Sequence, residues 1–249
     1  MKLAITDNMN FANPERPEIM GQFVGSVAGM GEACRALDYP VVSGNVSLYN
    51  ETKGVGIPPT PAIGGVGLIP DWTKTATIAL KADGNLLLLI GFEDGHLGQS
   101  LYQLLIAQKP EGAPPPVDLN AELKAGGLVR GLIRSGQAKA VHDCSDGGLL
   151  VAIAEMALSG GKGVELYPYE GKLPPFSSWF GEDQGRYVLE VSPAQASAIT
   201  ASARALGLPA RVVGKVGGTA VALKGEAALP LDDLRHVHES WLPGLMGAK

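Results

Sequence analysis

Apolar positions along the chain follow two periods, the alternation that is typical of strands and the spacing of three to four residues that is typical of helices. Pro17 opens a helix whose apolar side chains recur on one face from Ile19 to Cys34. The run 85–91 is apolar throughout, as in strands that are buried on both faces of an α/β sheet. The N-terminal part is further predicted to contain strands at 3–6, 63–69 and 75–81, and another that begins at residue 40.

Strands and helices alternate through the rest of the chain, and this alternation indicates α/β architecture. We place a boundary near residues 82–84, so the expected lobes are 1–82 and 83–249. The C-terminal lobe is predicted to contain strands at 85–91, 138–143, 187–191 and 210–216, and helices at 98–108, 119–135, 149–158, 193–206 and 231–245. The last of these helices is expected to dock through four apolar side chains, those of Leu234, Val237, Trp241 and Leu245.

Composition narrows the class of protein. The 249 residues carry a net charge of -5 and no basic run, which argues against a nucleic-acid-binding surface. Two cysteines without paired spacing suggest neither a zinc site nor a disulfide framework. The first residues lack the apolar run of a signal peptide, and no stretch reaches the roughly 20 apolar residues of a membrane span. We therefore expect a cytoplasmic protein with no nucleic-acid or membrane partner.

A first group of polar residues follows the strand predicted at 3–6. Asp7, Asn8 and Asn10 are expected in a loop at the end of that strand, where α/β proteins commonly bind their ligands. A carboxylate or an amide there could bond a nucleotide or a water of a bound metal. The alternative is that these side chains only form turns with the backbone before Pro14, as Asn and Asp often do.

A second group, residues 43–52, is dense in hydroxyls and amides. Gly44 permits close approach of the backbone to a phosphate or a base. Asn45 offers a hard carbonyl oxygen suited to Mg²⁺, and Ser47, two residues on, is expected on the same strand face. The alternative is a polar hairpin tip with no ligand. Neither a Walker loop nor a G-x-G-x-x-G turn occurs, so an ordinary P-loop or dinucleotide fold is unsupported.

Two further polar turns carry weaker signals. In 142–149 a predicted strand passes through a Gly-Gly turn into a helix whose free N–H groups could hold an anion, unless Ser145 or Asp146 simply caps the helix. Cys144 is not expected to be a nucleophile, because neighbouring aspartates oppose a thiolate. Arg186 could reach a phosphate, or it could form a surface ion pair with a neighbouring acid.

Read in order, four motifs resemble the phosphoribosylformylglycinamidine synthase family, and the resemblance covers essentially the whole chain. They are LAITDNMNFANP at 3–14, GNVSLYNE at 44–51, PTP at 59–61 and HDCSDGGL at 142–149. The resemblance implies an aminoimidazole ribonucleotide synthetase-like fold, in which a partial A lobe contributes strands to a shared β-barrel and a B lobe is of α/β type. It also implies that the full synthetase has two such A–B pairs, of which this chain corresponds to the second.

The same resemblance implies roles for four residues. Asp7 and Gly44 fall on nucleotide-contacting positions, Asn45 on a Mg²⁺ ligand, and Ser47 on a position that touches the ribonucleotide substrate. No catalytic residue is carried over, because the catalytic histidine of the family belongs to the first A–B pair. We expect the carboxylate of Asp7 and the amide of Asn45 to face one pocket.

The implied activity is ATP-dependent conversion of formylglycinamide ribonucleotide to its amidine with ammonia derived from glutamine. The γ-phosphoryl group of ATP moves to the amide oxygen of the substrate, and ammonia then displaces phosphate. The implied partners are the missing N-terminal half of the synthetase, a glutaminase subunit and a small adaptor subunit, and the chain alone is expected to be inactive. The alternatives are another ATP-dependent synthetase or kinase of the same superfamily, or a non-catalytic assembly scaffold.

Overall fold

The computed structural model describes residues 2–247 of the chain. The chain divides into two compact units, Met1–Trp72 and Thr73–Lys249. Residues 73–82, which we expected in the first lobe, therefore belong to the second unit. No helix within the described residues is both long and apolar enough to cross a membrane.

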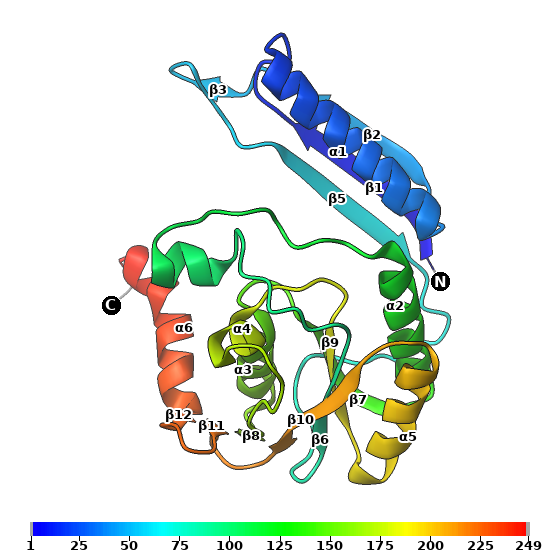
Figure 1. Cartoon of the computed structure of the whole chain (residues 1–249), viewed down its shortest axis with the longest axis vertical. Helices are drawn as coiled ribbons and strands as arrows, with labels where there is room; N and C mark the ends of the chain where they lie inside the picture. The colour runs from blue at the N-terminus through cyan, green and yellow to red at the C-terminus, as the bar shows by residue number, and fades with distance from the viewer. Residues whose placement is uncertain (1, 248–249) are drawn as a thin grey trace. The chain divides into compact units, whose positions relative to one another are not determined.

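The first unit is a three-stranded sheet with a helix along one face (Figure 1). Its elements are β1 (Lys2–Asn10), α1 (Pro17–Ala36), β2 (Val41–Ser47), β3 (Glu51–Thr52), β4 (Val55–Gly56) and β5 (Thr60–Gly67). β1 is central in the order β2-β1-β5, parallel to β2 and antiparallel to β5, and β3 and β4 form a separate hairpin. Residues 7–10 thus lie in β1 and not in the expected loop, because pairing on both sides holds them extended despite the turn preference of Asp and Asn.

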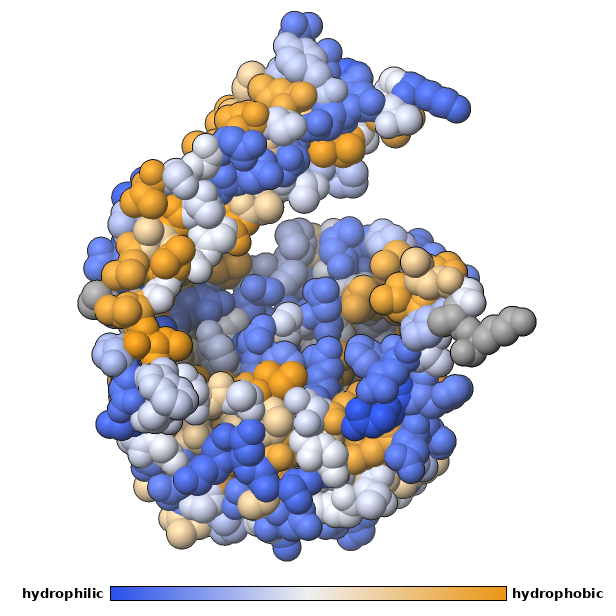
Figure 2. All heavy atoms as spheres, turned by 180° about the vertical axis from the view of Figure 1, so that it is seen from behind, coloured by the Kyte–Doolittle hydropathy of each residue, from blue (hydrophilic) through white to orange (hydrophobic). Residues whose placement is uncertain are grey.

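Helix α1 packs against the sheet through one face only. Phe23 of this helix meets Phe11 edge to face, with 5.2 Å between the ring centroids. A Cβ built at Gly21, Gly25 or Gly29 would meet no atom within 4 Å, so these glycines do not bring the helix close to the sheet. Apolar residues also lie on the surface of this unit among hydrophilic ones (Figure 2).

The second unit is built on a seven-stranded sheet with the order β12-β11-β8-β10-β6-β9-β7. Its strands are β6 (Leu86–Ile90), β7 (Ala138–Asp143), β8 (Val164–Leu166), β9 (Tyr187–Val191), β10 (Ala210–Val216), β11 (Ala220–Leu223) and β12 (Leu229–Pro230). Its helices are the π-helical turn η1 (Gln103–Ala107), α2 (Leu119–Arg134), α3 (Gly148–Gly160), α4 (Pro175–Phe180), α5 (Pro193–Ala205) and α6 (Leu231–Leu245). The strand pairs are antiparallel except that of β8 and β11, which is parallel.

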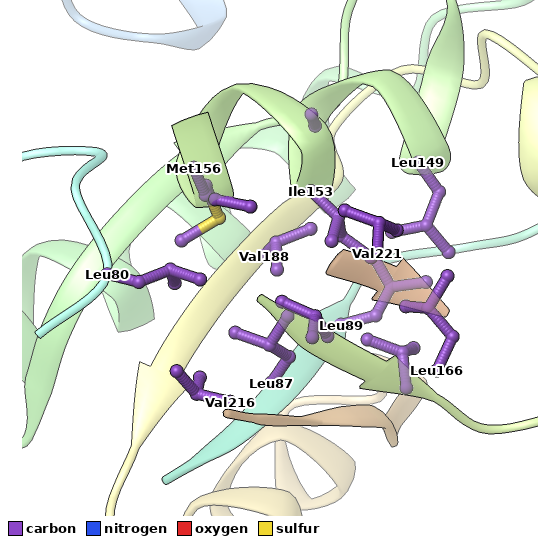
Figure 3. Close-up of a cluster of buried hydrophobic side chains, with 14 of the residues drawn as sticks. Leu80, Leu87, Leu89, Leu149, Ile153, Met156, Leu166, Val188, Val216 and Val221 are labelled. Carbon is purple, nitrogen blue, oxygen red and sulfur yellow. The ribbon is translucent and has the colours of Figure 1, made fainter. Parts of the chain in front are cut away.

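Strand β6 separates the two hydrophobic layers of the second unit. Leu87 and Leu89 belong to a cluster with side chains of α3 and α4 (Figure 3). Leu88 and Ile90 belong to a second cluster, with side chains of α2 and α5. All four side chains are at most 1% exposed, so the prediction of a strand buried on both faces is confirmed, as is the α/β class.

Two predicted elements of the second unit are absent or reduced. Residues 75–81 were expected to form a strand, but only Thr77 bridges a strand residue, Ala140 of β7. The helix expected at 98–108 is reduced to about two turns around η1, and Gln108 closes it in the left-handed conformation with φ 52°.

Helix α6 has the predicted bounds but not the predicted contacts. Val237, Trp241 and Leu245 are 72%, 68% and 65% exposed, so the expectation that they dock the helix is wrong. The helix packs instead through its first turns, where Leu231 is buried and Leu234 lies against the core. An apolar stripe predicts a helix but does not say how much of that stripe is covered.

Candidate functional site

Asp7 of β1 and Gly44 of β2 are cross-strand partners in a parallel pair. Their side-chain positions share one face of the sheet, because a Cβ built on Gly44 would lie 1.8 Å from Asp7 Oδ1. This is the face that α1 covers, since Ile5 and Ile63 line a cavity of about 180 Å³ together with residues of that helix. The two positions that we assigned to nucleotide contact are therefore adjacent, and the carboxylate occupies the space that a side chain at residue 44 would need.

Asn45 and Ser47 project from the opposite face of the same sheet. Asn45 is the cross-strand partner of Asn8, and Ser47 is the partner of Asn10. Successive side chains of a strand point to opposite faces, so Asn45 and Ser47 share a face, as expected from their spacing. For the same reason the carboxylate of Asp7 and the amide of Asn45 do not face one pocket, and our expectation on this point was wrong.

A depression of about 460 Å³ lies over the three strands. It is lined by residues from β1, β2 and β5, namely Thr6, Asp7, Asn8, Ser43, Gly44, Asn45, Ala62, Ile63 and Gly64. Most of these residues are on the Asn45 face, whereas Asp7, Gly44 and Ile63 form a middle row whose side chains point toward α1. The middle row therefore contributes mainly backbone to the floor of the depression.

Neutral oxygens dominate the donor set of this depression. Ser43 Oγ donates to Thr6 Oγ1 at 2.8 Å. Asn8 Oδ1 is buried without a hydrogen-bond partner, and it lies next to Asn45 across the strands. Mg²⁺ prefers hard oxygen ligands and keeps several positions for water and phosphate, so this donor set fits the ion. Among the described residues, no group of three or more His, Cys, Asp or Glu side chains could hold a metal.

The hydroxyl of Ser47 is held by Asn50. Ser47 Oγ donates to Asn50 Oδ1 at 3.2 Å, and Asn50 Nδ2 lies 3.1 Å from the same hydroxyl. Asn50 Nδ2 also donates to the carbonyl of Ser47 at 2.8 Å and to that of Phe11 at 3.1 Å. Asn50 thus ties the ends of β1 and β2 together and orients the hydroxyl that we assigned to the substrate.

The turn at residues 143–148 already holds an anion, which is a carboxylate of the protein. Glu182 Oε1 accepts hydrogen bonds from the backbone N–H groups of Gly147 and Leu101, each at 2.8 Å. Gly147, in the left-handed conformation with φ 79°, is the N-cap of α3 and makes no side-chain cap bond. Ser145 donates instead to Asp143 at 2.6 Å, which lowers the pKa of that carboxyl, so neither of the capping residues that we considered caps this helix.

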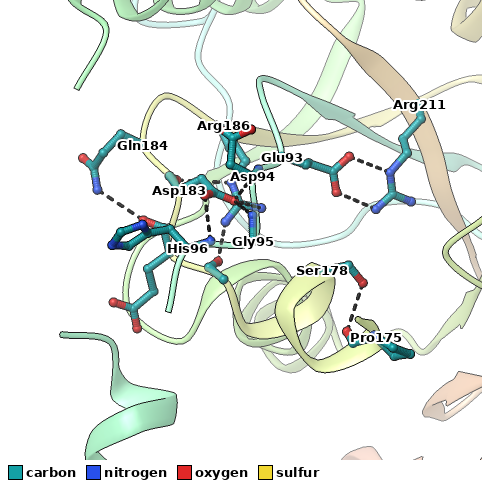
Figure 4. A network of polar contacts seen from close by, with 12 residues as sticks. Glu93, Asp94, Gly95, His96, Pro175, Ser178, Asp183, Gln184, Arg186 and Arg211 are labelled. Atoms are coloured by element: carbon teal, nitrogen blue, oxygen red, sulfur yellow. Dashed lines mark hydrogen bonds and ion pairs between the residues drawn. The ribbon is translucent and has the colours of Figure 1, made fainter. Parts of the chain in front are cut away.

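Arg186 is buried and not at the surface, but it does form an ion pair with one of the neighbouring acids considered for it. Its guanidinium forms an ion pair with Asp183, 3.7 Å between Nη1 and Oδ2, and donates to two backbone carbonyls (Figure 4). Asp183 also accepts from the backbone N–H groups of residues 94–96 at 2.9–3.2 Å. Burial raises the pKa of Cys144 to about 12, which agrees with the expectation that this thiol is not a nucleophile.

The structure also shows carboxylates that the sequence patterns did not mark as structural. Glu190 is completely buried and accepts from the backbone N–H groups of Lys81 and Ala82 and from Asn85 Nδ2. Glu182 and Asp183 perform the same task elsewhere in the unit. The sequence signal that could have indicated such a role is the position of Glu190 within the otherwise apolar run of β9. An acid in a buried strand requires several hydrogen-bond donors.

The chain is thus an α/β protein whose N-terminal unit carries a depression lined in part by amide and hydroxyl groups. Family models of AIR synthase related proteins match both units, the N-terminal domain at residues 1–69 and the C-terminal domain at residues 82–224. The chain belongs to the AIR synthase related protein family.

Curated relatives give a more specific likeness. The chain is 57% identical over 245 residues to phosphoribosylformylglycinamidine synthase subunit PurL of Bradyrhizobium sp. strain BTAi1, a match of 98% of this chain and 33% of the relative. It is 57% identical over 247 residues to the subunit of the same name of Rhodopseudomonas palustris strain TIE-1, covering 99% of this chain and 34% of the relative. The chain thus spans about a third of the length of these relatives.

Solved structures confirm the fold. The structure of T. maritima PurL complexed with FGAR matches with a TM-score of 0.71 and 19% identity, covering 93% of this chain and 39% of that one. E. coli HypE matches with a TM-score of 0.70 and 19% identity, covering 93% of this chain and 73% of that one. Because such different proteins match equally well, the fold alone does not select between them, whereas the sequence identity to PurL subunits does.

Proposed function

We propose that this chain is the second A–B portion of a phosphoribosylformylglycinamidine synthase subunit and that it contributes one wall of the site for ATP, Mg²⁺ and formylglycinamide ribonucleotide. The observation that carries this proposal is the 57% identity to PurL subunits over 98% of the chain. The parent enzyme would be the ATP-dependent ligase of purine biosynthesis that forms formylglycinamidine ribonucleotide, and it would act in the cytoplasm. T. maritima PurL has been solved in complex with ATP and in complex with FGAR, which supports both ligands.

The strand register suggests a separate role for each of the residues Asp7, Gly44, Asn45 and Ser47. Asn45 would hold Mg²⁺ on the open face, and Ser47, two residues along the same face, would contact the ribonucleotide. The bound ion would neutralise charge on the phosphates during phosphoryl transfer, which is the chemistry that a metal supplies in such reactions. The chain itself supplies a rigid sheet in which hydrogen bonding on both sides of β1 fixes the spacing of these groups.

Asp7 and Gly44 lie on the other face, so we propose that they reach the nucleotide around the edge of the sheet. Within the described residues β2 is an edge strand, and its outer backbone groups at Gly44 pair with no further strand. The carboxylate of Asp7 lies directly over this glycine. A nucleotide bound along the edge could contact the carboxylate on one side and the cation at Asn45 on the other, with only the bare backbone of Gly44 between them.

The proposed activity also requires the rest of the synthetase and two further subunits. The chain spans about a third of its relatives, so we propose that the N-terminal half of the synthetase supplies the catalytic groups and that the isolated chain turns over no substrate. A glutaminase subunit and a small adaptor subunit would deliver ammonia. One of the matching structures is that of PurLQS from Thermotoga maritima, whose name is consistent with an assembly of such subunits.

Calorimetric titration of Mg²⁺–ATP into the chain tests the binding role. We expect weak, magnesium-dependent binding by the unaltered chain and its loss in Asn45→Ala. Asn10→Ala is the matched control, because this amide lies on the same face but bonds within the sheet to the carbonyls of Asn8 and Thr60. A scaffold would show no magnesium-dependent binding in any variant. A chain that binds ATP in this titration but does not bind formylglycinamide ribonucleotide in a second one would favour another kinase or synthetase of the superfamily. Robust amidine formation by the chain alone would refute its inactivity.

A further inference from the structure

Asn8 is the one residue of the sheet with an unexplained polar atom. Among the described residues, two buried side-chain atoms lack a hydrogen-bond partner, Asn8 Oδ1 and Arg186 Nη1. The guanidinium of Arg186 has an ion-pair partner in Asp183. The amide oxygen of Asn8 has none among the described residues, as is found for groups whose partner is a water or a bound ion.

The other polar side chains near Asn8 are already engaged. Thr6 and Ser43 bond each other, and Asn10 donates to the backbone carbonyls of Asn8 and Thr60. Asn45, the cross-strand partner of Asn8, is the one neighbour whose amide makes no hydrogen bond within the described residues. Two unengaged amides thus stand side by side on the face that carries the depression.

We propose that Asn8 is a second protein ligand of the divalent cation assigned to Asn45, and that it binds through Oδ1 either directly or through a water of the ion. This inference rests on the proposed function. Asn8 lines the depression, and the terminal torsion of an asparagine turns readily, so the oxygen can swing into the depression when a cation enters.

The amides of Asn8 and Asn45 are suitable ligands for a cation that also binds phosphate oxygens. Both ligands are neutral amide oxygens, so they fix the position of the ion without cancelling its charge. The full positive charge then remains available to the phosphate oxygens that complete the coordination shell. Since Asn8 lies on the central strand and Asn45 on the edge strand, the ion would be held on the side of the sheet where the edge gives access to a nucleotide.

Titration of Mn²⁺ into the chain in the presence of a non-hydrolysable ATP analogue, followed by electron paramagnetic resonance of the free ion, tests the proposal. Asn8→Ala is expected to weaken Mn²⁺ binding about tenfold or more, in the range found when supporting groups of metal sites are removed. Asn8→Asp keeps an oxygen and should retain the affinity. Asn10→Ala, the control on the same face, should leave it unchanged.

Thermal unfolding without metal separates a ligand from a structural residue. Because Asn8 Oδ1 has no partner in the sheet, Asn8→Ala should unfold at the same temperature as the unaltered chain or higher. A clear drop in that temperature, or unchanged Mn²⁺ affinity in Asn8→Ala beside a loss in Asn45→Ala, would overturn this inference and leave the proposed function standing. Absence of Mn²⁺ binding by the unaltered chain would count against both.

Discussion

The carboxylate of Asp7 lies where a side chain of Gly44 would begin, 1.8 Å from the position of a built Cβ. Gly44→Ala must therefore displace either the carboxylate or the β1–β2 pairing. We expect it to lower the free energy of unfolding by about 1–3 kcal/mol, as overpacking substitutions do, and to weaken nucleotide binding. Urea denaturation and calorimetry measure the two effects.

Two further variants make this test specific. Asp7→Ala added to Gly44→Ala removes the contact with the carboxylate but leaves the carbonyl oxygen of residue 7 at 2.8 Å from the new Cβ, so the double variant should regain part of the lost stability. Gly25→Ala is a matched glycine substitution in open space on a helix, and it should raise the free energy of unfolding by up to about 1 kcal/mol. Equal losses in the single and double variants would show that the carboxylate of Asp7 is not the group that opposes a side chain at residue 44.

Asn50 orients Ser47, so its removal should impair substrate binding without removing the hydroxyl. Asn50→Ala takes a donor from the carbonyls of Ser47 and Phe11, and we expect a loss of stability of about 1 kcal/mol. Titration of formylglycinamide ribonucleotide should show weaker binding to Asn50→Ala, as it should to Ser47→Ala. If Asn50→Ala bound the ribonucleotide normally while Ser47→Ala did not, the orienting role of Asn50 would be excluded.

Glu182 is expected to be a major stabilising residue of the second unit. Its Oε1 accepts from Gly147 and Leu101, and Glu182→Ala would leave both N–H groups without this partner. We expect a loss of roughly 1.5–3 kcal/mol, the range for a hydrogen bond to a charged group, and faster amide exchange at both residues. Glu170→Ala, at an exposed acid, is the control and should unfold at nearly the same urea concentration as the unaltered chain.

The buried thiol of Cys144 predicts a specific response to alkaline pH. Its pKa is raised to about 12 by burial, whereas the pKa of an unperturbed thiol is 9.0. The unfolded chain therefore loses this proton at lower pH than the folded chain, so the contribution of Cys144 to stability is present below about pH 9 and is lost as pH rises toward 12. Cys144→Ala should show a shallower fall in unfolding free energy over this interval, by at most roughly 4 kcal/mol.

Alkylation offers a direct check on the same thiol. At pH 8 the folded chain should react with iodoacetamide at Cys34, which is partly exposed, and not at Cys144. Both should react in denaturant. Rapid modification of Cys144 in the folded chain would contradict the burial of this thiol.

Sequence patterns predicted the elements whose limits are set by local chemistry. The strands at 138–143, 187–191 and 210–216 and the helix at 231–245 have the observed bounds, because apolar runs there end at Gly, Pro or polar turns. Residues 7–10 were predicted as a loop from their turn preference, which the hydrogen bonding of β1 to two neighbours outweighs. The exposed face of α6 could not be foreseen, since a stripe of apolar residues does not reveal its partner.

The arrangement of the four candidate site residues could not be predicted from the sequence. Asp7, Gly44, Asn45 and Ser47 come together in one sheet, yet their distribution over two faces depends on strand register. A shift of one residue exchanges the faces of all side chains that follow, and periodicity does not fix the register of one strand against another. The unpartnered oxygen of Asn8 depends on three-dimensional packing and leaves no trace in the order of residues.

Val42 interrupts the ladder between β1 and β2 next to the candidate site. The pairing of β1 with β2 passes from Ile5–Val41 directly to Thr6–Ser43, so Val42 is an extra residue that bulges out of the ladder. Deletion of Val42 would make these two pairs consecutive, so Asn45 would stay opposite Asn8 on the same face of the sheet. Val41 and Ser43 are two positions apart yet point to opposite faces because Val42 is inserted between them. A change in length after Ser43, and not the loss of Val42, would therefore exchange the faces of the proposed ligands.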